Sequence, residues 1–249
     1  MASSEQGIFE RAVSEGATVR LYYEVHGEGF PLLAIAPGGL RSSVKGWHNR
    51  PIEPAMFGDE YKVITLDQRN AGQSWAPISA RDSWHSYADD QLALLDHLGV
   101  DRFHVIGMCI GGAHALRLAK TAAERVASAV LIQPIGLSDN RDVFTALCTS
   151  WHDEMRARHP EASEADYTAF FQNMFGGDFT FSATAEEVAA CIVPMLVLLG
   201  DDEYHPASIS RRVAELAPRA SLIEEWKQDP ALSRARERIR SFFRKHTPS

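Results

Sequence analysis

Hydrophobic residues along this 249-residue chain gather in short runs that alternate with stretches of helical spacing. Apolar runs of this length are typical of strands that are buried on both faces of a sheet. Strands are predicted at residues 31–36, 61–67, 103–106, 126–132, 194–199 and 221–225. Helices are predicted at residues 52–58, 86–98, 113–119, 208–216 and 231–245. The alternation predicts an α/β fold, with a mostly parallel central sheet and helices on both of its faces.

Two parts of the chain depart from this alternation. Residues 9–13 and 18–25 alternate between apolar and polar positions, which predicts an antiparallel strand pair. Residues 137–193 contain several aromatic residues and helical patches but no clear strand. We therefore predict a small helical cap at 137–193, inserted into a core domain formed by residues 1–136 and 194–249.

Composition and charge argue against several classes of protein. Hydrophobic residues make up 45% of the chain and charged residues 23%, which predicts a packed core rather than disorder. The net charge is −8, and no basic cluster precedes the last helix, so neither nucleic acid nor an anionic membrane is expected as a partner. No stretch approaches the roughly 18 apolar residues of a membrane span. The N-terminus lacks a basic leader with an apolar run, so no signal peptide is expected.

The cysteines and histidines indicate a compartment and exclude an obvious metal site. The three cysteines, Cys109, Cys148 and Cys191, are odd in number and far apart, which is typical of reduced thiols in the cytoplasm. No Cys/His spacing resembles that of a zinc site, and neither a metal nor a cofactor is expected. The expected partner is a small-molecule substrate. A homodimer is a further alternative, because the edge strands and the final helix could pair with a second copy of the chain.

Residues 102–118 combine a strand, a tight turn and a helix, with Cys109 at the turn. Gly107 and Gly111 lie two residues before and after it. A nucleophile on such a strained turn is exposed at the end of its strand, and side chains at the flanking positions would collide across the turn. The start of the helix favours a thiolate at Cys109. The pattern therefore predicts a reactive cysteine; the alternative is a small buried hydrophobic residue.

Two backbone N–H groups are candidates for an oxyanion hole near this turn. Ile110 begins the predicted helix, and Gly39 lies in the loop after the strand at 31–36. A dinucleotide-binding turn is the other glycine-rich arrangement between a strand and a helix. Here the spacing is Gly-x-x-x-Gly-Gly, and the next strand ends without the acidic residue that would bind a ribose, so this alternative is disfavoured.

Four motifs along the chain form a set. They are Pro37-Gly38-Gly39, Asp67-x-Arg69-x-x-Gly72-x-Ser74, Gly107-x-Cys109-x-Gly111 and Gly200-Asp201-Asp202. Through them the chain resembles the α/β-hydrolase fold superfamily over nearly its whole length, with the first motif at the oxyanion loop and the third at the nucleophile elbow. Most members carry serine at the elbow. Cysteine there is similar to the dienelactone hydrolases, whereas the rest of the chain resembles the capped, esterase-like branch.

The resemblance implies an acid after the penultimate strand and a histidine after the last strand. Asp202 keeps the family's four-residue spacing from the acid to a proline, and it is the candidate acid. The loop at 226–230 contains no histidine, so the triad looks degenerate. His205, on the acid loop itself, is the first substitute. Weaker candidates, for which a surface or packing role is the alternative, are His48, His152, His159 and His246. Structural roles are expected for His97, His104 and His114.

The function predicted first is that of a cysteine-dependent hydrolase or acyltransferase for a small, partly apolar ester, thioester or lactone. Cys109 would attack the carbonyl, and Asp202, through His205, would assist proton movement. The missing histidine keeps two alternatives open. One is a cofactor-free lyase, isomerase or cyclase, and the other is a catalytically impaired small-molecule-binding protein. The substrate pocket is predicted to include Leu40, Trp47, His48, Met108, Phe175 and Phe179.

Overall fold

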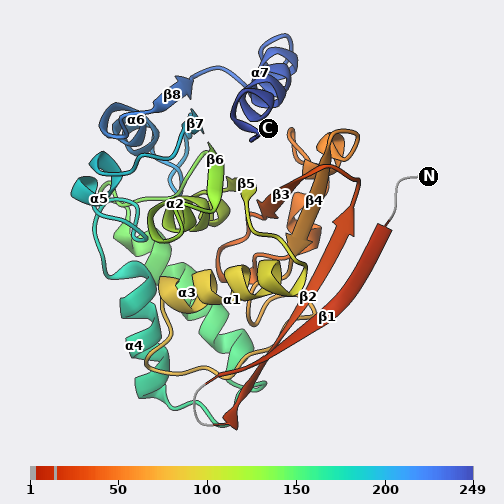
Figure 1. Ribbon diagram of the computed structural model, residues 1–249. Helices are drawn as coiled ribbons and strands as arrows, with labels where there is room; N and C mark the ends of the chain where they lie inside the picture. Colours follow the sequence, from red (N-terminus) through yellow and green to blue (C-terminus); the bar gives the residue numbers. More distant parts are fainter. Residues whose placement is uncertain (1–3, 14–15, 249) are drawn as a thin grey trace.

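Eight strands form one sheet in the computed structural model, which describes residues 4–13 and 16–248. The strands are β1 Ser4–Ala12, β2 Thr18–His26, β3 Phe30–Ile35, β4 Tyr61–Leu66, β5 Phe103–Met108, β6 Val126–Ile132, β7 Met195–Leu198 and β8 Ala220–Ile223. Their order across the sheet is β1-β2-β4-β3-β5-β6-β7-β8. β2 pairs antiparallel with β1 and β4, and every later pair is parallel. The predicted mostly parallel sheet is confirmed (Figure 1).

Seven α-helices are found in the described residues. They are α1 Trp84–His97, α2 Ile110–Thr121, α3 Arg141–Met155, α4 Glu164–Phe175, α5 Ala185–Ala189, α6 Ala207–Leu216 and α7 Ala231–His246. The helix predicted at 52–58 is a 3-10 turn, Pro54–Phe57. The helix predicted at 86–98 begins at Trp84, because Ser83 rather than Ser86 is its N-cap. The Ser86 hydroxyl instead completes a capping box with Ser83.

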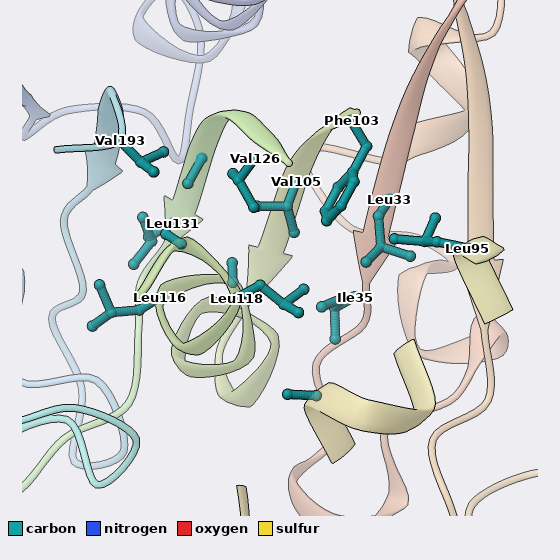
Figure 2. Packing of buried hydrophobic residues seen from close by; sticks show 14 of the residues in the cluster. Leu33, Ile35, Leu95, Phe103, Val105, Leu116, Leu118, Val126, Leu131 and Val193 are labelled. Carbon is teal, nitrogen blue, oxygen red and sulfur yellow. The ribbon is translucent and has the colours of Figure 1, made fainter. Parts of the chain in front are cut away.

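Helices cover both faces of the sheet because successive strand residues point to opposite sides. On β3, Leu33 and Ile35 pack with residues of α1, α2 and α6. Leu32 and Ala34, on the same strand, pack with residues of α7 and of the 3-10 turn Pro54–Phe57. Figure 2 shows side chains of the first face gathered between α2 and the sheet. Two apolar layers therefore enclose the parallel strands, which explains why these strands read as continuous apolar runs.

The segment between β6 and β7 carries α3, α4 and α5, and it packs in two different ways. Aromatic residues of α3 and α4, such as Phe144 and Phe170, form a third cluster with Trp84 and Tyr87 of α1. Val188 of α5 belongs instead to the cluster between α2 and the sheet. The cap boundaries at 137 and 193 therefore stay a prediction, with α5 packed on the core. None of the helices in residues 4–13 and 16–248 is long and apolar enough to cross a membrane.

Candidate active site

Cys109 occupies a sharp turn between β5 and α2. Its backbone has φ 61° and ψ −121°, a conformation that L-residues rarely adopt and that costs on the order of 1–3 kcal/mol. The flanking glycines are required by space: a Cβ on Gly107 would lie 1.9 Å from the Gly111 oxygen. A Cβ on Gly111 would lie 2.0 Å from the oxygen of Ile35. The turn can therefore form only with glycine two residues before and two residues after the cysteine.

Backbone N–H groups from two loops converge on the sulfur. The N–H groups of Ile110, at the start of α2, and of Gly38, in the loop after β3, lower the pKa of the Cys109 thiol. Gly39 follows Gly38 and lies against Leu147 of α3. Gly38 and the predicted donor Gly39 both line the pocket at the sulfur.

Buried Asp67 and Ser42 support the loop that carries these glycines. Asp67 accepts hydrogen bonds from the N–H groups of Val44 and Gln73, each at 2.7 Å. The hydroxyl of Ser42 donates to the Ala36 carbonyl at 2.7 Å. The Asp67 motif found in the sequence therefore holds in place the segment that follows Gly38 and Gly39.

The loop after β7 brings an acid and a histidine together. Asp202 and His205 are three residues apart, and His205 Nδ1 lies 2.7 Å from Asp202 Oδ1. The same carboxylate accepts the N–H groups of Tyr204 at 3.0 Å and His205 at 3.1 Å. Gly200 lets this loop fold back, because a Cβ there would lie 2.3 Å from the His205 oxygen. The loop is thus a compact turn in which the acid orients the histidine beside it.

The second ring nitrogen of His205 lies at the same pocket as the thiol. Nε2 is buried and has no hydrogen-bond partner among the described residues, and the ring lines the pocket together with Cys109, whose thiol interacts electrostatically with it. Burial raises the pKa of Cys109, but His205 and the two backbone N–H groups outweigh it, so the thiol pKa lies below its ordinary value. Burial lowers the pKa of His205, and Cys109 and Asp202 together raise it above the ordinary value. These opposite shifts favour a thiolate–imidazolium pair.

A pocket of about 380 Å³ opens at this sulfur. Its lining comes from the oxyanion loop, the elbow, α3 and the acid loop: Gly38, Gly39, Arg41, Cys109, Ala146, Leu147, Ser150, Tyr204 and His205. Four segments far apart in the sequence therefore meet at one end of the parallel strands, where α/β sheets bind ligands.

A comparison with known families matches residues 31–230 to the model described as alpha/beta hydrolase fold. The chain belongs to the α/β-hydrolase fold family. A protein of Azorhizobium caulinodans named as a carbamate hydrolase, RutD, is 31% identical, over 86% of this chain and 89% of that protein. The uncharacterized carboxylesterase nap of Bacillus subtilis is 26% identical, over 77% of this chain and 70% of that protein. Residue similarity to named hydrolases thus extends through most of the chain, which is an enzyme of this α/β-hydrolase family.

Solved structures show the same fold. A thermophilic esterase from Thermogutta terrifontis superimposes with a TM-score of 0.69 at 20% identity, covering 98% of this chain and all of that one. The enol-lactonase from Burkholderia xenovorans LB400 gives a TM-score of 0.68 at 18% identity, covering 94% and 99% of the two chains. At these identities the likeness supports the hydrolase fold.

The six side chains predicted to line the substrate pocket of this hydrolase lie outside the pocket at Cys109. Trp47 and Met108 pack on the side of the sheet covered by α7, and Leu40 is buried with Ile110 and aromatic residues of α3 and α4. His48 is exposed. Phe175 lines a separate cavity between α3 and α4, and Phe179 packs beside the main core. Closeness to a motif in the sequence therefore did not indicate which residues line this pocket.

The remaining histidines lie in other surroundings. His152 contacts Glu164 at 3.1 Å, and His159 contacts Glu161 at 2.8 Å while stacking on Trp75. His246 ends α7 and packs against Phe242. His104 and His114 are buried, and burial lowers the pKa of each to about 3. Of the ten histidines in the chain, His205 is the one that lines the pocket with Cys109.

Arg41, Ser150 and Tyr204 are pocket residues that sequence reasoning missed. Tyr204 directly precedes His205, so its place near the pocket could have been predicted from the sequence. Arg41 lies two residues after Gly39 and was equally close to a known motif. Ser150 carries no local signal, because its place depends on how α3 docks over the elbow. Within the described residues, no cluster of three or more His, Cys, Asp or Glu side chains could hold a metal ion.

Proposed function

We propose that this α/β-hydrolase acts through a covalent acyl-enzyme on Cys109, with a small, partly apolar ester, thioester or lactone as substrate. The observation that carries the proposal is that Asp202 holds His205 through Nδ1 at the pocket that Cys109 also lines, while the buried Nε2 of His205 has no hydrogen-bond partner among the described residues. The triad is then complete rather than degenerate, with the histidine supplied by the acid loop. The names of the relatives, carbamate hydrolase and carboxylesterase, describe cleavage at a carbonyl group and support the same class of reaction.

In the proposed reaction, His205 Nε2 takes the thiol proton and Cys109 Sγ attacks the carbonyl carbon. The negative charge that develops on the carbonyl oxygen is held by the N–H of Ile110 and an N–H of the Gly38-Gly39 loop. The bond to the leaving alkoxide breaks as His205 returns the proton to that oxygen. Water then gives a proton to Nε2 and attacks the thioester, and the carbon–sulfur bond breaks to release the acid.

Asp202 keeps the ring of His205 in the tautomer that this cycle requires. Its carboxylate is 45% exposed in the side chain. Burial raises the pKa of Asp202, while His205 and the two backbone N–H groups lower it more, so the carboxylate stays ionised. We further propose that α3 and α4 form the cap over this pocket. In this proposal the pocket binds a small-molecule substrate. The enzyme is cytoplasmic, which agrees with its three free cysteines.

The experiment that tests this function is acyl trapping by mass spectrometry. Wild-type protein mixed with p-nitrophenyl acetate should gain one acetyl group on Cys109 before steady state. The Cys109→Ala variant should gain none and should lose turnover, whereas Cys148→Ala, which alters a buried thiol outside the pocket, serves as the control. Turnover retained by Cys109→Ala without an adduct would instead favour a lyase, isomerase or cyclase.

Alkylation of Cys109 by iodoacetamide is expected to have a pH midpoint below that of free cysteine, about 8.5. The rate rises as the thiol ionises, and the folded protein lowers the pKa of this thiol. Burial raises the pKa of Cys148 to about 12 and also raises that of Cys191. At neutral pH the label should therefore appear on Cys109 alone, as read by peptide mapping. A Cys109 midpoint above that of free cysteine would contradict the thiolate–imidazolium pair.

A further inference from the structure

Arg41 gives the pocket at Cys109 a cationic side chain. Besides the imidazole of His205, its guanidinium is the basic group among the described residues that line this pocket. Arg41 ends the short 3-10 turn Gly39–Arg41, so the segment that carries the oxyanion loop also carries the cation. A positive group so close to the reacting sulfur can select substrates by charge.

Contacts with α3 orient the guanidinium without using all of its donors. Arg41 Nε donates to Glu154 Oε2 at 2.6 Å, and Nη2 donates to Ser150 Oγ at 3.1 Å. No partner of Nη1 is found in residues 4–13 and 16–248. Because a guanidinium presents five N–H donors in a planar fork, the Nη1 edge is left for a ligand.

The ion pair with Glu154 does not neutralise Arg41 firmly. The side chains are 39% and 47% exposed, and ion pairs of this kind contribute little because water screens them. A substrate carboxylate can bind Nη1 beside Glu154 or can displace Glu154 from the guanidinium. The guanidinium therefore keeps its positive charge available to a ligand in the pocket.

The rest of the pocket favours an anion of small size. The N-terminus of α2 and the N–H groups of Gly38 and Ile110 point toward the sulfur. Asp202 also lies near, and His205 pairs with it. Leu147 of α3 also lines the pocket, and it approaches Gly39 so closely that a Cβ on this glycine would lie 2.7 Å from the leucine Cδ1. This apolar wall, together with Ala146, limits the length of the acyl group.

We propose that Arg41 binds a carboxylate of the substrate, so that the enzyme's substrates are small esters, thioesters or lactones that carry an anionic group. The inference rests on the proposed function for the identity of the reacting carbonyl. It goes further by assigning the charge of the substrate and the residue that recognises it. In a chain of net charge −8, this pocket is a local site for an anion.

The test compares 3-acetoxybenzoate with its neutral counterpart, 3-acetoxybenzamide, by calorimetric binding to the full-length Cys109→Ala protein, which should not cleave them. The carboxylate should bind about tenfold more tightly than the amide, the expected effect of a charge-assisted hydrogen bond. Adding Arg41→Gln should bring the ratio to about one, and Arg41→Lys should keep part of the preference because it keeps the charge. Arg211→Gln, which removes a similarly exposed pair with Glu224, is the control.

Equal affinities of the two probes, no binding of the carboxylate up to about 10 mM, or a preference that survives Arg41→Gln would each overturn the proposal. In the active enzyme, Arg41→Gln should raise the KM for the carboxylate about tenfold more than it raises the KM for the amide. The binding measurement does not use the thiol. Failure of carboxylate binding therefore leaves the cysteine chemistry standing, and absence of an acyl adduct leaves the anion site standing.

Discussion

Replacement of His205 by alanine is expected to lower kcat/KM for p-nitrophenyl acetate about a thousandfold, within the range for loss of a general base. The thiol loses the group that accepts its proton, and the leaving alcohol loses its proton donor. The thiol pKa should also rise, since burial alone raises it and His205 is the largest opposing contribution. Steady-state kinetics and the pH dependence of alkylation measure both effects in one variant.

His48→Ala and His246→Ala are the matched controls for this loss. His48 is exposed beside the oxyanion loop, and His246 lies at the end of α7. Each should retain wild-type kcat/KM. Full activity of His205→Ala, combined with loss of activity in either control, would assign the proton shuttle to another histidine.

Gly111→Ala is expected to destabilise the enzyme by about 3 kcal/mol, the upper part of the usual range for overpacking. Alanine normally stabilises a helix relative to glycine, and Gly111 lies in the first turn of α2. Here the added Cβ would lie 2.0 Å from the backbone oxygen of Ile35, and backbone atoms cannot move aside without shifting β3. Urea unfolding followed by tryptophan fluorescence measures the change in the free energy of unfolding.

Gly177→Ala provides the comparison for this effect. Gly177 has an ordinary backbone conformation, and a Cβ there would meet its nearest atom at 3.5 Å, a normal contact. The variant should unfold within about 0.5 kcal/mol of wild type, as most surface substitutions do. A similar loss in both variants would mean that the elbow is less tightly packed against β3 than the structure indicates.

The sequence predicted the fold and the elbow because both depend on the pattern of residues that are close together in the chain. The apolar runs of β3 to β7 follow from burial on two faces, and Gly107 and Gly111 follow from crowding at one turn. The contact between Asp202 and His205 was predictable for the same reason, since the two residues are three positions apart in the sequence. Its meeting with Cys109 depends on where β7 stands in the sheet, which the pattern alone did not specify.

The lining of the pocket was much less predictable than its reactive centre. Ala146, Leu147 and Ser150 reach Cys109 only because α3 docks over the elbow, and that docking is decided by the packing of aromatics on α3, α4 and α1. The predicted lining residues Trp47 and Met108 pack on the far side of the sheet. Met108 is a strand residue, and side chains change face with every step along a strand, whereas Trp47 ends the 3-10 turn Val44–Trp47. Closeness to a motif therefore did not indicate which residues line the pocket.

The short Asp202-x-x-His205 turn places the proposed acid and base on one loop, so neither depends on the C-terminal strand and helix. In the proposed triad every reacting group precedes Pro206, so β8 and α7 supply burial and contribute no proton-handling group. Substitutions after that point should then affect the stability of the fold rather than the proposed proton transfers. Exchange of a single loop, from Gly200 to Pro206, would transfer acid and base together into a related hydrolase, with their mutual geometry already set by Asp202 accepting the N–H groups of Tyr204 and His205.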